Sequence, residues 1–239
     1  MIMIHMLKES LRRKKKRQLI KSGPGIFDWD WNQIHYNRIA LINYVVAKFP
    51  NECRYLEIGC FKNDLFSSVP VTDKVGIDPE QGGNMRCTSD EFFAQNQKTF
   101  DVIFIDGLHT YEQTRKDVIN ATKHLSKNGW IALHDLLPRN AAEAHLPRVS
   151  SSWTGDVWKL GFELANTKGV DFKIIKIDCG VGILRLTGEP VIFSNQHQSQ
   201  LQSKAFDYYY ERFSQLPTVS WREALAWVDL TERTLEVES

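Results

Sequence analysis

The sequence predicts an α/β fold: a Rossmann-like, mainly parallel sheet that is flanked by helices and ends in an antiparallel β-hairpin. From Arg54 onward, short apolar runs alternate with amphipathic segments, which is the pattern of βα units. The runs expected to form parallel strands are residues 55–58, 74–78, 100–106 and 130–135. Residues 172–178 and 181–186 are separated only by Cys179-Gly180, which fits a tight turn between antiparallel strands. Such a hairpin distinguishes this sheet from a nicotinamide-binding domain, whose strands continue parallel.

Helical spacing of apolar residues predicts the helices beside this sheet. One helix, capped by Asp28 or Asp30, is expected to run to about Phe49. A second lies between the third and fourth strands, with Asn128-Gly129 as its C-terminal stop. A third covers residues 156–165, and the aromatic-rich C-terminal segment predicts two more. Those aromatic side chains are expected in the core or in a subunit interface, which leaves a homo-oligomer open.

Length and composition predict one main domain. The chain has 239 residues, of which 42% are hydrophobic and 25% charged, so it can bury a sizeable core. We assign residues 26–239 to this domain, with a lid or specificity loop near 138–156 and a C-terminal helical segment. Residues 1–25 form a basic arm that is expected to be flexible or a solvated helix. Nucleic-acid or membrane contact is the less favoured interpretation, because no aromatic residues interleave with the charges.

Composition also excludes several classes of protein. No apolar run approaches the roughly 20 residues that cross a bilayer, and no secretory signal precedes the basic arm, so we expect a cytoplasmic protein. The chain has four cysteines but no Cys-x-x-Cys pair, which excludes a zinc knuckle or a redox motif of that type. Reduced thiols are expected.

Polar residues end each predicted strand, and this regularity predicts a binding site. In an open α/β sheet, ligands bind beyond the carboxyl ends of the strands. Glu57 and Gly59 end the first strand, and a glycine there lets the backbone approach a ligand closely. Asp78 ends the second strand, about 20 residues further on, which is the spacing at which an acid binds ribose hydroxyls.

The third and fourth strand ends carry groups suited to catalysis or metal binding. Asp106 ends the third strand, with His109 in the loop that follows, and His134-Asp135 ends the fourth. Asp106 and Asp135 could bind a divalent cation, and the residue types do not choose between magnesium, manganese and others. Acid–base chemistry by His109, His134 or Asp135 without a metal is an equally supported interpretation.

Residues 55 to about 137 resemble the class I S-adenosylmethionine-dependent methyltransferases. The likeness is strongest to the small-molecule O-methyltransferase branch, which includes catechol, caffeoyl-coenzyme A and macrolide-sugar enzymes. Glu57-Ile-Gly59 looks like the first cofactor motif of that family, and the terminal hairpin resembles its sheet. The resemblance implies that Glu57 and Asp106 surround the amino-acid end of the cofactor and that Asp78 binds its ribose.

The same resemblance extends to the adenine site. Residues 88–93 are placed like the segment whose first residues flank the adenine ring, which implies that Ser89 and Asp90 lie near adenine.

Two positions depart from the family pattern. Phe61, Lys62 and Asn63 follow Gly59 where the family has small residues, although asparagine tolerates unusual backbone angles. The metal-dependent members carry Asp-Asn or Glu-Asp after the fifth strand of their sheet, and this chain has His134-Asp135 there.

The expected function is O-methylation of a hydroxylated small molecule, such as a sugar, by S-adenosylmethionine. Whether a divalent cation such as magnesium is a second cofactor is left open by the sequence. The alternative is a non-catalytic protein that keeps the cofactor fold and docks to RNA or an acidic surface through its basic arm. A nicotinamide oxidoreductase is disfavoured, because no Gly-x-Gly-x-x-Gly follows the first strand. Protein and nucleic-acid substrates stay open as alternatives, although the absence of an Asn-Pro-Pro-aromatic tetrapeptide disfavours nucleic acid.

Overall fold

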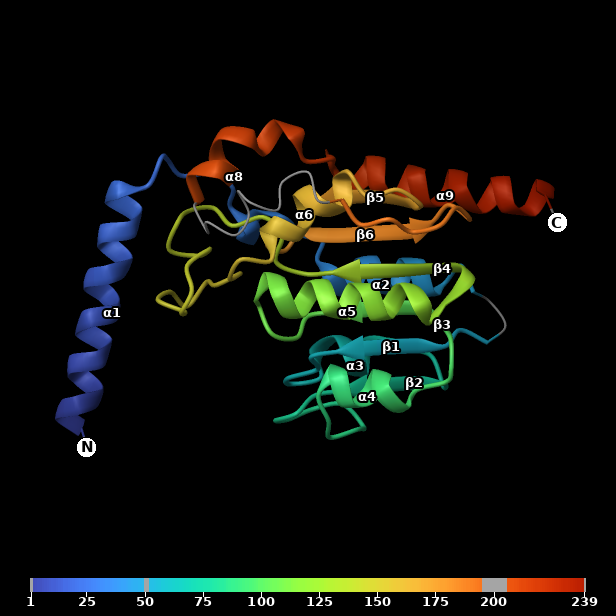
Figure 1. The fold of residues 1–239 in the computed structure, drawn as a ribbon, viewed down its shortest axis with the longest axis horizontal. Helices are drawn as coiled ribbons and strands as arrows, with labels where there is room; N and C mark the ends of the chain where they lie inside the picture. Colours follow the sequence, from blue (N-terminus) through green and yellow to red (C-terminus); the bar gives the residue numbers. More distant parts are fainter. Residues whose placement is uncertain (1, 50–51, 195–205, 239) are drawn as a thin grey trace.

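A seven-stranded sheet forms the centre of the protein in the computed structural model, which describes residues 2–49, 52–194 and 206–238 (Figure 1). The strand order is β2-β1-β3-β4-β6-β5-β7. Strands β1 to β4 pair in parallel, whereas β6 runs antiparallel to β4 and β5. The predicted fold class is therefore confirmed. The strand bounds are Tyr55–Ile58 (β1), Lys74–Ile77 (β2), Phe100–Ile105 (β3), Leu125–Leu133 (β4), Val170–Ile175 (β5), Val181–Leu186 (β6) and Thr218–Val219 (β7).

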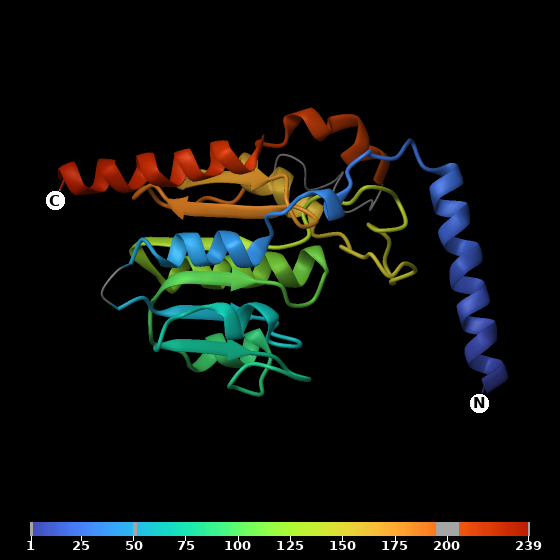
Figure 2. The same ribbon diagram turned by 180° about the vertical axis from the view of Figure 1, so that it is seen from behind.

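Helices cover both faces of the sheet, and side-chain alternation along the strands decides which residues meet which helix. On β3, Ile103 and Ile105 face the layer of α4, α5, α6 and α8, and Val102 and Phe104 face the layer of α2, α3 and α9. Figures 1 and 2 show these layers from opposite sides. The helix bounds are Arg38–Val46 (α2), Asp64–Ser68 (α3), Ser89–Gln95 (α4), Tyr111–Lys123 (α5), Trp158–Ala165 (α6), Phe206–Arg212 (α8) and Trp221–Glu238 (α9).

The basic arm is a helix, α1 (Ile2–Ser22), which projects away from the sheet and its two helical layers (Figures 1 and 2). Its side chains from residue 4 onward are exposed or half-buried. No helix in the described part of the chain is both long enough and apolar enough to cross a membrane.

The predicted helix from Asp28 or Asp30 to Phe49 is wrong as a single element. Asp30 does cap a helix, but only the short 3-10 turn η1 (Trp31–Gln33), by accepting the N–H of Asn32. The backbone is extended at Ile34, and α2 starts afresh behind its own cap, Asn37. The helical spacing of apolar residues therefore runs through a break in the helix, and the break is set by the two caps Asp30 and Asn37.

The predicted helix stop at Asn128-Gly129 is also wrong. Helix α5 ends at Lys123, and the carbonyl of His124 already accepts the N–H of Phe100 in the sheet. Gly129 lies inside β4, beside an irregularity in the pairing with β3, and a Cβ atom there would come within 2.8 Å of the Asp101 carbonyl. The glycine therefore permits a close approach of two strands.

The C-terminal segment forms two α-helices, as predicted, joined through the short 3-10 turn η2 (Phe213–Gln215) and β7. Phe206 and Tyr209 of α8 are buried in the core, which agrees with the core interpretation of these aromatic residues.

Candidate active site at the carboxyl ends of the strands

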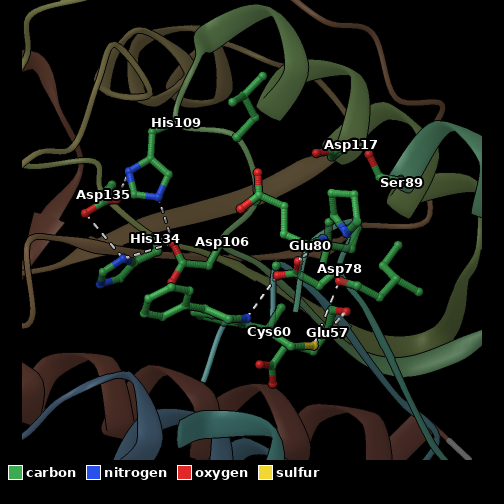
Figure 3. A pocket seen from close by; sticks show the side chains of 18 of the residues that line it. Glu57, Cys60, Asp78, Glu80, Ser89, Asp106, His109, Asp117, His134 and Asp135 are labelled. Atoms are coloured by element: carbon green, nitrogen blue, oxygen red, sulfur yellow. Dashed lines mark hydrogen bonds and ion pairs between the residues drawn. The ribbon is translucent and has the colours of Figure 1, made fainter. Parts of the chain in front are cut away.

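A cavity of about 770 Å³ opens beyond the carboxyl ends of β1 to β4 (Figure 3). All of the residues that the sequence predicted for the site line it: Glu57, Gly59, Asp78, Ser89, Asp90, Asp106, His109, His134 and Asp135. The structure therefore brings the predicted residues together. The role of each residue stays a prediction.

The turn after β1 brings the backbone to the cavity floor. Gly59 has a φ of +86°, and a Cβ atom at this position would overlap the backbone carbonyl of Asp106. Phe61 and Asn63 also adopt left-handed conformations, with φ values of 45° and 65°. Asn63 occupies the N-cap of α3, so the turn accommodates the residues that depart from the family pattern.

Asp78 is held ionised at the end of β2. Its carboxylate accepts the backbone N–H groups of Phe61, Glu80 and Gln81 at 2.8 to 2.9 Å. Burial raises its pKa, but these N–H groups together with Arg86 outweigh burial, so the pKa of Asp78 lies below its usual value. Three of about four acceptor positions are filled by the backbone, which leaves room for a ligand hydroxyl.

Glu57 is buried at the end of β1 and accepts a hydrogen bond of 2.6 Å from the Tyr55 hydroxyl. Burial raises the pKa of Glu57 to about 7, and the nearby charge of Asp106 acts in the same direction. The side chain can therefore take up or release a proton near neutral pH.

Ser89 and Asp90 meet two residues of α5 that the sequence analysis missed. The Gln113 amide donates to Ser89 at 3.1 Å, to Asp90 at 3.3 Å and to Asp117 at 3.0 Å. Burial raises the pKa of Asp117 to about 6. Gln113 and Asp117 are four residues apart and share one helix face, a spacing that could have indicated them.

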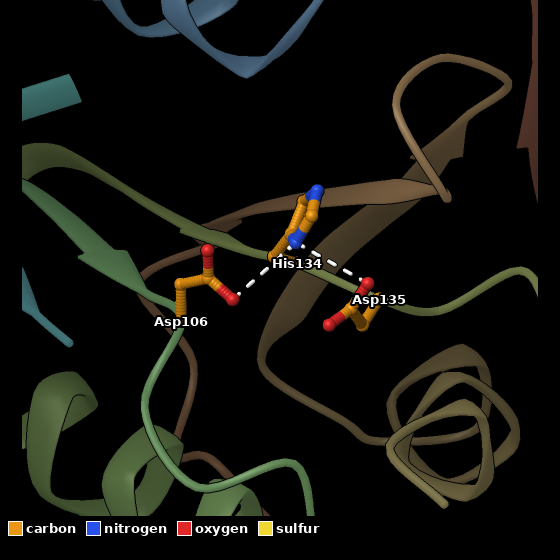
Figure 4. Close-up of side chains that lie close together, drawn as sticks. All are labelled: Asp106, His134 and Asp135. Carbon is orange, nitrogen blue, oxygen red and sulfur yellow. Dashed lines mark ion pairs between the residues drawn. The ribbon is translucent and has the colours of Figure 1, made fainter. Parts of the chain in front are cut away.

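Asp106, His134 and Asp135 converge at the ends of β3 and β4 (Figure 4). One ligand atom from each lies within 4.8 Å of the others. The Nδ1 atom of His134 is 3.3 Å from Asp106 Oδ1 and 3.3 Å from Asp135 Oδ1. His109 adds a second imidazole, with Nδ1 2.7 Å from Asp135 Oδ2 and Nε2 3.5 Å from Asp106 Oδ1.

The charges in this cluster shift one another's titration. Burial lowers the pKa of His134, but Asp135 and Asp106 outweigh it and hold the pKa well above its usual range. The same balance, with Asp135 as the main partner, raises the pKa of His109. Burial raises the pKa of Asp135, yet the two imidazoles bring it well below its usual value.

Arg38 and Asp178, which were not predicted from the sequence, complete the cluster. Asp178 follows β5 and lies 3.6 Å, through Oδ1, from the Nε2 atom of His134. Its Oδ2 accepts from the Arg38 guanidinium at 2.8 Å and from the Arg38 backbone N–H at 3.1 Å. Arg38 stands at the start of α2, so no sequence motif joins these residues.

The irregular segment after β4 supplies one wall of the cavity. Arg148 and residues 151–153 line it, within the predicted loop near 138–156. The Trp153 ring stacks on His109, with centroids 4.8 Å apart and planes at 8°. The Trp153 carbonyl lies 3.2 Å from His109 Nδ1. The loop therefore touches the imidazole that faces the cavity.

Comparison with known proteins gives one family match. Residues 79–136 match a family model described as a methyltransferase domain. This stretch contains Asp106, His109, His134 and Asp135. The methyltransferase resemblance predicted from the sequence is confirmed over these residues. No curated protein matches the chain.

Solved structures of methyltransferases are similar at low identity. The O-methyltransferase TomG from Streptomyces achromogenes, in complex with SAM, has 15% identity and a TM-score of 0.44, over 62% of this chain and 78% of its own. The methyltransferase PaMTH1 from Podospora anserina, bound to S-adenosylhomocysteine (SAH), has 17% identity and a TM-score of 0.45, over 74% of this chain and 96% of its own. The mycinamycin-pathway methyltransferase MycE, with Mg, SAH and mycinamycin VI, has 16% identity and a TM-score of 0.41, over 63% and 50%.

Proposed function

We propose that this protein transfers a methyl group from S-adenosylmethionine to a hydroxyl group of a small molecule such as a sugar. The observation that carries the proposal is the gathering of acidic strand ends and two imidazoles around one cavity. The family match over residues 79–136 supports methyl transfer as the reaction class. The similar structures of TomG and PaMTH1, which contain SAM and SAH respectively, are consistent with this cofactor.

The cofactor is proposed to lie across the ends of β1, β2 and β3. Asp78 would accept from the ribose hydroxyls, and Ser89 and Asp90 would flank the adenine ring. Glu57 and Asp106 would bind the ammonium of the methionine end, since two carboxylates stabilise a positive charge there. Gly59 leaves the space that this backbone approach needs.

The acceptor is proposed to lie over the cluster of Asp106, His109, His134 and Asp135, covered by the loop near 138–156. Methyl transfer is an in-line displacement, so holding the acceptor oxygen against the methyl group supplies much of the rate. His109, or His134 or Asp135, would take the hydroxyl proton as the oxygen attacks. His109 is the first choice, because it faces both the cavity and the loop.

A divalent cation fits the same cluster. Asp106 and Asp135 offer carboxylate oxygens, and His134 has two buried ring nitrogens without a hydrogen-bond partner among the described residues. When bound, such a cation supplies Lewis acidity that eases ionisation of a coordinated hydroxyl. Magnesium is one candidate, and it is present with the similar protein MycE.

The non-catalytic alternative is not favoured, because the cavity keeps a complete set of polar strand ends.

The proposed function is tested by transfer of radiolabelled methyl groups from S-adenosylmethionine to a panel of sugars, phenols and other hydroxylated molecules. We expect turnover on at least one acceptor class, and loss of turnover in Asp78→Ala. Binding of the cofactor with no transfer to any acceptor would favour the alternative.

His109→Gln tests the assignment of the base. We expect kcat to fall by about 100-fold or more, the usual contribution of a positioned general base. SAH affinity should change little, because the cofactor carboxylates are intact. The matched control is His124→Gln, which alters a histidine bonded to the backbone carbonyls of Asn120 and Asn96 outside the cavity. Unchanged turnover in His109→Gln would remove this residue from the mechanism.

A further inference from the structure

The three converging ligand atoms of Asp106, His134 and Asp135 form a mixed set of one imidazole and two carboxylates. His134 and Asp135 are more than nine-tenths buried, at 9% and 3% exposure, whereas Asp106 is half-buried and reaches the cavity. The set is therefore closed on one side and open on the side where a ligand would enter.

Buried polar atoms inside this set that lack a hydrogen bond indicate that a ligand belongs there. Both ring nitrogens of His134 and the Oδ2 atom of Asp135 are buried and make no hydrogen bond of acceptable geometry within the described residues. The same atoms do form ion-pair contacts of 2.7 to 3.6 Å with neighbouring charged side chains. Ion pairing without a hydrogen bond leaves these buried atoms incompletely satisfied, so the cluster can accept a further ligand.

The surroundings of His134 assign separate tasks to its two nitrogens. Nδ1 faces the carboxylates of Asp106 and Asp135, while Nε2 faces Asp178 at 3.6 Å. A histidine that binds a metal through one nitrogen commonly directs its other N–H at a carboxylate, which fixes the ring and raises its basicity. Asp178 is in turn fixed by Arg38, so the ring orientation is supported from behind.

An imidazole in this position changes which cation the set favours. Magnesium prefers oxygen ligands in near-ideal octahedral geometry, whereas imidazole suits first-row transition metals, whose affinity rises from manganese toward copper. We infer that His134, held by Asp178, makes this a site for a first-row transition-metal dication in preference to magnesium. This inference deepens the proposed function, and it rests on that function only for the use of the metal in methyl transfer.

Calorimetry on the full-length, chelator-treated protein tests the inference, with Mg²⁺, Mn²⁺ and Co²⁺ as the probes. We expect Co²⁺ to bind more tightly than Mn²⁺ and Mn²⁺ more tightly than Mg²⁺. In H134E and H134N, which supply oxygen in place of the imidazole, the Co²⁺ to Mg²⁺ affinity ratio should fall by about tenfold or more. In the control H124Q the ratio should stay as in the wild type.

A second measurement needs no variant. Proton NMR of the Co²⁺-loaded wild type should show a strongly shifted, exchangeable imidazole N–H resonance, which the geometry assigns to Nε2–H of His134. Absence of this resonance, no metal binding by the wild type, or an unchanged affinity ratio in folded H134E and H134N would each overturn the inference. SAH calorimetry separates the two ideas, since metal preference without SAH binding would contradict the proposed function alone.

Discussion

Asp135 occupies a left-handed backbone conformation, with a φ of 68°, two residues beyond the end of β4. A residue other than glycine that is held in such a conformation costs of order 1–3 kcal/mol, and functional sites are where this cost is commonly retained. The conformation places the Asp135 carboxylate among His109, His134 and Asp106. Its position at the end of β4 was predictable from sequence, but its backbone conformation was not.

The raised pKa of Glu57 predicts that the affinity for SAH depends on pH. Its pKa of about 7 means that the free protein carries a neutral Glu57 below neutrality and a carboxylate above it. The cofactor ammonium favours the carboxylate, so SAH binding should release a proton near pH 6. SAH affinity should therefore rise between pH 6 and pH 8, with a slope of up to tenfold per pH unit below the pKa.

The measurement is calorimetry across this pH range in buffers of different ionisation enthalpy. Asp117 titrates at about pH 6 in the same cavity, so D117N serves as the control that retains Glu57. The rise should persist in D117N and flatten in E57Q. A pH profile that E57Q leaves unchanged would show that Glu57 does not meet the cofactor ammonium.

At the scale of elements, the turn between β5 and β6 holds the end of β4 in place. The N–H groups of Leu136 and Leu137 donate to the carbonyls of Gly180 and Cys179 at 3.1 and 2.8 Å. This pairing fixes the chain directly after His134 and Asp135. The hairpin thus contributes to the site as well as to the sheet.

Substitution of two glycines with nearly equal φ angles measures this contribution. Gly180 and Gly188 have φ values of 87° and 88°, but a Cβ atom at Gly180 would overlap Leu137, whereas nothing lies within 4 Å at Gly188. Gly188→Ala should cost about 1–2 kcal/mol of unfolding free energy from backbone strain alone. Gly180→Ala should cost a further 1–3 kcal/mol, roughly, from overpacking. Urea unfolding compares the two variants, and equal costs would show that the turn does not pack against the end of β4.

Strands were predicted more closely than helices, and the physical reasons differ. The bounds of β1 and β6 match the predicted runs, because both strands consist mainly of buried apolar residues. The prediction of a single helix before β1 was wrong, because Asp30 and Asn37 cap two separate elements within one apolar pattern. The prediction of a helix end at residues 128–129 was wrong, because Gly129 lies in a strand and allows close contact with the neighbouring strand.

Some residues of the candidate site could be predicted from the sequence and others could not. Strand-end residues could be predicted, since parallel strands place their carboxyl ends at one edge. Asp178 and Arg38 could not, because their contact joins positions 140 residues apart that only the folded chain brings together.

At the scale of the whole molecule, the polar strand ends gather at one edge of the sheet, and the basic N-terminal run lies away from it (Figure 1). Helix α1 carries the basic run and projects away from the sheet (Figures 1 and 2). The cavity wall combines acidic strand ends with two imidazoles, and its other basic side chains are Arg38, Lys62 and Arg148. A cavity of this composition suits a ligand that carries positive charge and hydroxyl groups, as S-adenosylmethionine does.

Calorimetric titration of the full-length protein with S-adenosylmethionine, SAH and NAD tests this central claim most directly. We predict saturable binding of the first two ligands at one site per chain, weakened by Asp78→Ala, and no binding of NAD. Absence of binding by both S-adenosylmethionine and SAH, or binding that Asp78→Ala leaves unchanged, would contradict the account.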